Sequence, residues 1–333
     1  MNTFPLRSGW RSLLMLALGT TSLYGQQFDG VLRGHDGAVL MGVFTPDGQR
    51  AATVSSDQTA RVWDLTTGQL QRRYEQHTGP VYSLAASQSG HTLVTGSQDN
   101  TVRVWDLPAF TADELLVPAG VPVRGIVLHP DGNRLLAVTV DKTLSVHTLR
   151  TSPLTRGAVP KPIPPEVRTG HGSEVRAVDV RSDGVAYASA DIEGRIVLWN
   201  PFLPAAQRTL LGSAAAVSAV RFSATNQQLV SSGADGHLRV WQLNTPAPRA
   251  LPPLSAEVVE LDLLTGQSVV VVALADKTVR VINLTDDSLV AQYPPVPFAI
   301  RGVAHAPNNA WVAVAGDQGQ TTIANAADGV VRG

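Results

Sequence analysis

Hydrophobic and polar residues alternate along most of the chain with the period of two that is typical of half-buried β-strands. In the first clear unit, apolar positions at Val39 and Val43 lead to a turn at Thr45–Gly48, and a second apolar run covers Ala51–Val54. An acidic turn and the segment Ala60–Trp63 complete the unit. Short runs separated by turn residues predict four antiparallel strands.

This unit recurs along the chain, and each copy has an acidic residue followed six positions later by Trp, His or Ile. The acidic positions are Asp57, Asp99, Asp141, Glu193, Asp235, Asp276 and Asp317. Their spacings are 42, 42, 52, 42, 41 and 41 residues, so seven units account for nearly the whole sequence. One small four-stranded sheet is not stable alone, and repetition at this period therefore implies stacking of the sheets into a closed ring.

The Asp-to-Trp frame, as in Asp57-Gln-Thr-Ala-Arg-Val-Trp63 and its copies, resembles the WD40 repeat family over about residues 28 to 325. The resemblance implies an all-β fold, a seven-bladed propeller of four-stranded antiparallel blades. In that family an N-terminal segment supplies the outer strand of the last blade. We expect Phe28–Arg33 to close the ring in this way, because the tail Asp328–Arg332 is one strand more than seven blades need.

The first 25 residues have the three-part layout of a secretory signal. Arg7 and Arg11 precede an apolar run, Leu13–Leu18, and small and polar residues follow up to Gly25. The alternative is a membrane anchor, but the run is far shorter than the roughly 20 residues that span a bilayer. We expect cleavage near Gly25 and a periplasmic or secreted protein, a WD40-type propeller of the exported bacterial type.

Residues 26–333 then form the propeller domain, interrupted once. The 52-residue spacing places about ten extra residues around 151–167, between the third and fourth blades, and this segment holds five prolines. Proline cannot donate a backbone hydrogen bond to a sheet, so we expect a surface loop. It is either a spacer or a strap that docks a partner.

Composition excludes several classes of function. A net charge of −1 lacks the basic excess of a nucleic-acid-binding protein. The absence of cysteine excludes disulfides, thiol nucleophiles, zinc–thiolate and iron–sulfur sites. Charged residues make up only 16% of the chain, which favours a large buried core over disorder.

The WD40 resemblance implies a hydrogen-bonded chain in each complete blade, which joins a His, a Ser or Thr, the acidic residue and the Trp. Carried over to this sequence, the positions are His35, Thr53, Asp57 and Trp63; His77, Thr95, Asp99 and Trp105; His171, Ser189, Glu193 and Trp199; and Ser231, Asp235 and Trp241, with Ser213 at the His position. The third, sixth and seventh blades lack both the His and the Trp.

A His–Thr–Asp set looks superficially like a hydrolase triad, but an active site occurs once and a structural device occurs in every repeat. Buried carboxylates and imidazoles are costly unless paired, so this network is expected to stabilise the blades. No histidine pair has metal-ligand spacing, and no nucleotide-binding or hydrolase motif occurs. We therefore expect no catalytic residue, no metal and no cofactor.

Propellers of this family generally bind partners on the top face, where the loops that lead into the innermost strands converge. Aromatic and arginine side chains favour binding there. The candidates are Tyr82, Arg124, Glu174, Arg176, Glu257 and Arg301.

The sequence thus favours a noncatalytic scaffold that presents a rigid disc to a protein or peptide, as a monomer or as a subunit of a larger exported complex. It gives no indication of nucleic acid binding or stable membrane insertion. The alternative is an enzyme or cofactor-binding propeller with scattered loop residues at the central channel, because fold alone does not decide function.

Overall fold

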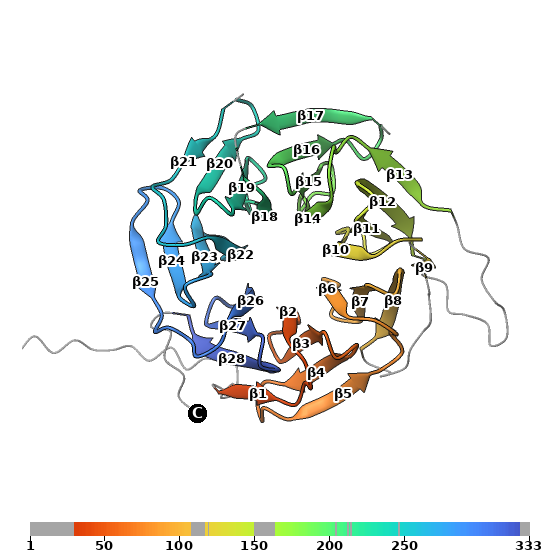
Figure 1. Cartoon of the computed structure of the whole chain (residues 1–333), viewed down its shortest axis with the longest axis vertical. Coiled ribbons are helices and arrows are strands. Elements are labelled where there is room, and N and C mark those ends of the chain that lie inside the picture. Colours follow the sequence, from red (N-terminus) through yellow and green to blue (C-terminus); the bar gives the residue numbers. More distant parts are fainter. Residues whose placement is uncertain are drawn as a thin grey trace, which may run out of the picture.

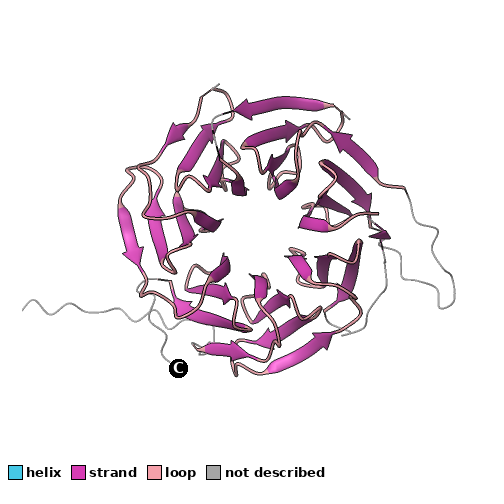
Figure 2. Ribbon diagram, viewed as in Figure 1, coloured by secondary structure: helices cyan, strands magenta, loops and turns pink. Residues whose placement is uncertain are grey.

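A computed structural model of the chain describes residues 30–107, 117–118, 120–149, 164–203, 205–211, 213, 215–245 and 247–326. The proposed signal segment, most of the 151–167 insertion and the tail Asp328–Arg332 lie outside these residues. The described chain consists of strands and loops (Figure 2). Seven four-stranded sheets surround a central axis as the blades of a propeller, which confirms the predicted fold (Figure 1).

Each of blades 1 to 6 is built from four strands that follow one another in sequence, from the inner to the outer strand. Blade 1 contains β2 (Val39–Phe44), β3 (Arg50–Ser55), β4 (Ala60–Asp64) and β5 (Leu70–Tyr74). Blade 2 contains β6 (Val81–Ala86), β7 (Thr92–Ser97), β8 (Thr101–Asp106) and β9 (Val117–Pro118). Blade 3 contains β10 (Val123–Leu128), β11 (Arg134–Thr139), β12 (Thr143–Thr148) and β13 (Glu166–Thr169).

The second half of the ring follows the same order. Blade 4 contains β14 (Val175–Val180), β15 (Tyr187–Asp191), β16 (Arg195–Trp199) and β17 (Ala206–Leu211). Blade 5 contains β18 (Val217–Phe222), β19 (Gln228–Gly233), β20 (Leu238–Gln242) and β21 (Arg249–Ala250). Blade 6 contains β22 (Val258–Leu263), β23 (Val269–Leu274), β24 (Val279–Asn283) and β25 (Leu289–Gln292).

Blade 7 joins the two ends of the described chain. It contains β26 (Ile300–His305), β27 (Trp311–Gly316), β28 (Gln320–Asn325) and, as its outer strand, β1 (Val31–Arg33). Strand β1 pairs antiparallel with β28, with Leu32 opposite Thr321. The predicted closure is confirmed, and it is carried by the last three residues of the segment Phe28–Arg33.

Turn chemistry explains why the units recur. In six blades the residue after the acidic position has a positive φ, near +60° to +90°, which allows a tight turn between the second and third strands. These residues are Gln58, Asn100, Lys142, Gly194, Gly236 and Lys277. The side-chain carboxylate of Asp57 accepts the backbone N–H of Thr59 (2.9 Å), and Asp276 does the same for Thr278 (3.0 Å), so the acid stabilises the turn in which it lies.

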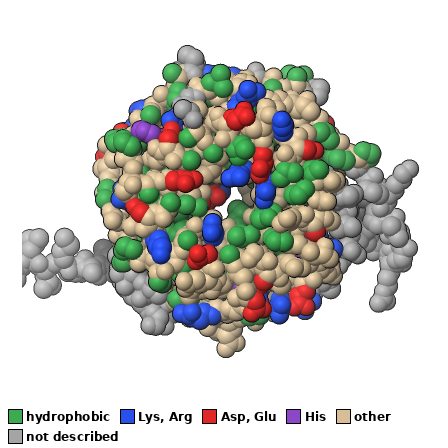
Figure 3. Space-filling model, viewed as in Figure 1, with side chains coloured by type: hydrophobic (Ala, Val, Ile, Leu, Met, Phe, Trp, Pro, Cys, Tyr) green, Lys and Arg blue, Asp and Glu red, His purple; other side chains and the backbone are tan. Residues whose placement is uncertain are grey.

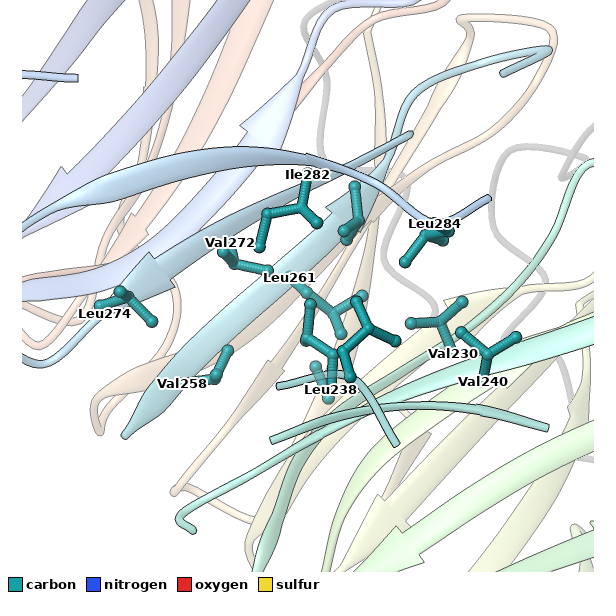
Figure 4. Close-up of a cluster of buried hydrophobic side chains, with 12 residues drawn as sticks. Val230, Leu238, Val240, Val258, Leu261, Val272, Leu274, Ile282 and Leu284 are labelled. Atoms are coloured by element: carbon teal, nitrogen blue, oxygen red, sulfur yellow. The ribbon is translucent and has the colours of Figure 1, made fainter. Parts of the chain in front are cut away.

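The core consists of hydrophobic clusters between adjacent blades. Between blades 5 and 6, for example, Val230 and Val240 pack with Leu261 and Val272, and none of these side chains is more than 3% exposed (Figure 4). Each blade therefore buries its faces only against its neighbours, and closure of the ring leaves no blade with an open face.

A buried arginine adds a polar tie between blades 3 and 4. The guanidinium of Arg168, on β13, is 1% exposed and donates to the backbone oxygens of Asn200 (2.6 Å), Pro201 (2.9 Å) and Leu203 (3.0 Å). It also donates to the carboxylate of Glu166 (2.8 Å). Arg208 of blade 4 and Arg249 of blade 5 contact the corresponding loops of the next blades.

Candidate functional site at the central channel

The predicted hydrogen-bonded chain is complete in blade 1. Trp63 Nε1 donates to Thr53 Oγ1 (2.8 Å), and the Thr53 hydroxyl lies 2.8 Å from His35 Nε2. An ionised carboxylate can only accept, so the imidazole proton is on Nδ1, which donates to Asp57 Oδ2 (2.8 Å), and Nε2 accepts the proton of the Thr53 hydroxyl. Burial lowers the pKa of His35, which keeps the ring neutral, as this pattern requires. Burial alone would raise the pKa of Asp57, but hydrogen bonds from His35 and Thr59 lower it.

Blade 2 repeats this geometry. His77 lies 2.8 Å from Asp99 Oδ2 and 2.7 Å from Thr95 Oγ1, and Trp105 Nε1 donates to Thr95 (3.0 Å). Burial also lowers the pKa of His77. The side chains of His77 and Asp99 are 1% and 5% exposed, so this set is closed to substrate and acts within the blade.

Blade 4 corrects one prediction. The partner of His171 is Asp191, 2.8 Å from Nδ1, and not Glu193. Asp191 is the last residue of β15, two positions before the turn residue that the repeat spacing indicates, and its carboxylate also accepts the backbone N–H of Glu193 (3.1 Å). Glu193 itself is exposed. The rest of the set is as predicted, since Ser189 bonds both His171 (2.7 Å) and Trp199 (2.7 Å).

Blade 5 has only part of the chain. Trp241 donates to Ser231 (2.9 Å), as predicted. Asp235, however, forms an ion pair with Arg239 (2.6 Å), and Ser213 bonds Ala215 in its own loop (2.7 Å). Without the histidine, no side chain that the structure describes bridges Ser231 and Asp235, so these two members of the predicted set are not connected there.

In blade 3 a histidine occupies the tryptophan position. His147 is 2% exposed and its Nε2 lies 2.8 Å from Ser145 Oγ, but its buried Nδ1 has no hydrogen-bond partner in the described part of the chain. Burial lowers the pKa of His147 to about 4.

A central channel of about 880 Å³ is lined by the inner strands of all seven blades. Side chains of both charges and hydrophobic side chains surround its opening (Figure 3). Every inner strand has a bulge or register shift after its first residue, as between Val39 and Met41 in β2. The bulged second residues line the channel at its top mouth, and they are Leu40, Tyr82, Arg124, Arg176, Ser218, Val259 and Arg301. A bulge redirects a side chain, which explains how the strand starts aim these residues at the mouth.

Four of the predicted contact residues form one continuous group on the top face. The guanidinium of Arg124 lies over the ring of Tyr82, 4.6 Å from its centroid, and Arg124 Nε donates to Glu174 (2.8 Å). Arg176 lies 3.5 Å from the same carboxylate and its side chain is 54% exposed. These residues come from blades 2, 3 and 4. Arg301 and Glu257 line the channel from blades 7 and 6, and both are exposed.

A second group of charged side chains lies deeper in the channel and was not predicted. Arg221 Nη2 lies 3.3 Å from Glu260 Oε1 and its Nε lies 3.8 Å from Asp262 Oδ1. Asp262 also accepts a hydrogen bond from His305 Nδ1 (2.7 Å), and Asp179 accepts the backbone N–H of Phe222 (2.7 Å).

These carboxyl groups have opposite pKa shifts. Burial raises the pKa of Asp179 to about 6 and that of Glu260 to about 7. Burial acts in the same direction on Asp262, but His305 and Arg221 lower its pKa. A comparison of the fifth residues of the inner strands would have found Asp179, Arg221 and Asp262, since all three occupy that position.

Within the described ranges, no group of three or more His, Cys, Asp and Glu side chains is placed to hold a metal ion. Nor does any helix in that part of the chain have the length and apolar character to span a membrane.

The family model for the WD domain, G-beta repeat (WD40), matches residues 26–64, 68–106 and 205–242. Two of these segments end with the third strands of blades 1 and 2, and the last ends with that of blade 5, so each sequence repeat runs from the outer strand of one blade into the next blade. No curated protein matches the chain. The chain therefore contains WD40 repeats in these three segments, and its described residues are built as a seven-bladed β-propeller.

Proposed function

We propose that this protein is a noncatalytic interaction scaffold that binds a protein or peptide partner across the top mouth of its channel. WD40 propellers are a fold typically used for protein–protein interaction. The observation that carries the proposal for this chain is the group formed by Tyr82, Arg124, Glu174 and Arg176, which three separate blades hold side by side at the mouth.

The chemistry of this group suits a protein surface. Tyrosine and arginine are the side chains that most often dominate binding energy at protein interfaces. Tyr82 is fixed by a hydrogen bond from its hydroxyl to Gln98 (2.6 Å), and Arg124 is fixed by Glu174, so both contact residues are ordered before a partner arrives. Such preorganisation lowers the entropic cost of association.

The experiment is selection of binding peptides from a displayed random library, with the mature domain as bait. We expect the wild-type protein to enrich a defined set of peptides, and a variant with Tyr82→Ala, Arg124→Ala, Arg176→Ala and Arg301→Ala to lose them. A matched control removes exposed arginines from the outer strands, with Arg33→Ala, Arg72→Ala and Arg73→Ala, and should keep them. Equal retention by both variants would refute the top-face assignment.

The proposal includes export through the N-terminal segment and work as a monomer or as one subunit of an exported complex. Cleavage near Gly25 predicts a mature protein that begins at Gln26. Mass spectrometry of the protein isolated from its native cells tests this, and a chain that still carries Met1 in the cytoplasm would contradict it.

One observation favours the alternative of an enzyme. Asp262 bonds His305 Nδ1 (2.7 Å), and His305 Nε2 lies 3.1 Å from the hydroxyl of Thr265, an acid–base–hydroxyl arrangement outside the repeated sets of blades 1, 2 and 4. However, the backbone N–H of Thr265 also points at His305 Nε2 (3.2 Å), which occupies the lone pair that a general base needs. Asn309 further braces this turn at Thr265 O (2.9 Å), as a structural contact would.

Hydrolysis of p-nitrophenyl acetate distinguishes the scaffold function from the enzyme function. The scaffold predicts that His305→Gln leaves the slow background rate unchanged. A rate that falls tenfold or more in the folded variant would favour the enzyme.

A further inference from the structure

The channel carries two layers of charge with opposite sign. At the mouth, the bulged second residues include Arg124, Arg176 and Arg301, and among the described residues only Arg124 has an ion pair shorter than 3 Å, to Glu174. Arg176 is more than half exposed and lies 3.5 Å from that same, already bonded carboxylate. Three arginines stand against the two carboxylates of Glu174 and Glu257, so the mouth offers a net positive charge to a partner.

Asp179, Arg221 and Asp262 lie three residues beyond the mouth positions of their inner strands, about 10 Å deeper at the rise of a β-strand. Glu260 lies one residue beyond Val259 and contacts Arg221 from nearer the mouth. Among the described residues, Arg221 is the arginine that pairs with Glu260 and Asp262, and its charge also acts on Asp179; its side chain is 22% exposed. Asp262 has His305 as a second partner, whereas Glu260 is paired with Arg221 and Asp179 accepts the backbone N–H of Phe222. The raised pKa values of Asp179 and Glu260, about 6 and about 7, agree with a shortage of positive charge around them.

The wall opposite this layer is apolar. The same fifth position of the inner strands is Val43, Ala85, Val127 and Ala304 in blades 1, 2, 3 and 7, and these residues line the same cavity. One side of the channel thus offers carboxylates and the other side offers aliphatic surface. A side chain that combines a long aliphatic stem with a terminal cation complements both walls.

We infer that the partner segment bound at the top mouth carries a basic side chain, lysine or arginine, which enters the channel between Asp179 and Glu260, and an adjacent acidic residue that pairs with Arg176 and Arg301 at the mouth. This inference rests on the proposed scaffold function and defines its partner as a short protein segment of mixed charge. The apolar wall holds the stem of the basic side chain, and the two charge layers fix the direction in which the segment enters.

To test this, the peptides that the mature domain selects from a random displayed library are sequenced. Wild type is expected to enrich peptides with a basic residue flanked by an acidic one, about tenfold over the unselected library. The double variant Asp179→Asn, Glu260→Gln is expected to lose the basic preference and keep the acidic one. The double variant Arg176→Ala, Arg301→Ala is expected to lose the acidic preference and keep the basic one. Glu193→Gln removes an exposed carboxylate outside the channel and should leave both preferences unchanged.

The asparagine and glutamine replacements keep the size of each side chain and remove its negative charge, and melting curves verify the fold of every bait. Selected peptides without a charge preference, or a preference that neither channel variant changes, would overturn the inference while the scaffold function stands. No enrichment over a bait-free control would overturn the proposed function as well.

Discussion

Replacing His77 with alanine removes the centre of a hydrogen-bonded chain buried in blade 2. The ring is 1% exposed and bridges Asp99 Oδ2 (2.8 Å) and Thr95 Oγ1 (2.7 Å). The bond to the charged acceptor contributes about 1.5–3 kcal/mol, and the Thr95 hydroxyl is left without its acceptor. Asp99 keeps the backbone N–H of Thr78 (3.0 Å), which limits the loss. We therefore expect the free energy of unfolding to fall by about 2–4 kcal/mol.

Urea denaturation of wild type and variant, followed by tryptophan fluorescence, measures this difference. The matched control is His91→Ala, because His91 is exposed in a turn and its truncation should change stability by less than about 0.5 kcal/mol. A double-mutant cycle with Thr95→Val should give a coupling energy of about 1–2 kcal/mol, since the two side chains are in contact. A His77→Ala variant as stable as His91→Ala would refute the structural role of the network.

Three further predictions concern other buried polar groups, and each is measured by the same denaturation assay. Asp191→Asn should destabilise the protein by about 1–3 kcal/mol, because Asp191 accepts a hydrogen bond from a buried imidazole. Glu193→Gln should leave the free energy of unfolding unchanged, and a larger loss for Glu193→Gln than for Asp191→Asn would restore Glu193 to the network. His147 titrates near 4 when folded and near 6.5 when unfolded, so its stability contribution is full above pH 6.5 and is lost as the pH falls toward 4. His147→Leu should therefore reduce the acid-induced loss between pH 7 and pH 5 by about 2 kcal/mol, and an unchanged pH profile would contradict this. Arg168→Met should cost about 2–3 kcal/mol, because backbone oxygens of the next blade lose a charged donor; no loss would show that the tie between blades contributes nothing.

The number of blades and the closure of the ring could be predicted because each repeat is defined by patterns within a few neighbouring residues. The alternation of hydrophobic and polar residues defines the strands, and the acidic turn fixes the position of each repeat along the chain. The count of outer strands then leaves β1 as the partner of β28. None of these features depends on the details of side-chain packing.

The choice between Asp191 and Glu193 could not be made from spacing. Counting back from Trp199 points to Glu193, because that residue holds the frame position of Asp57. The histidine instead donates its Nδ1–H to the carboxylate that reaches it, and the shorter acid at the end of β15 is the one that does so. Two carboxylates within three residues are equivalent in a pattern but not in three dimensions.

The deeper charge layer could not be recognised while each unit was read alone. Asp179, Arg221 and Asp262 lie about 40 residues apart and look like ordinary solvent-facing positions of three separate strands. Only the closed ring turns these positions inward, onto one wall of one channel. The residues at the strand starts could be named from the sequence for the converse reason, because this place is a property that each repeat shares; that they bind a partner stays a prediction.

Photo-crosslinking in the native cells tests the central claim most directly. A photoreactive amino acid in place of Tyr82 stands at the top mouth of the channel, and the same amino acid in place of Leu70 stands on the exposed outer strand of blade 1. A partner bound across the mouth predicts a discrete crosslinked species from position 82 and none from position 70. Crosslinking from position 70 alone, or from neither position, would contradict the claim that this face binds a partner.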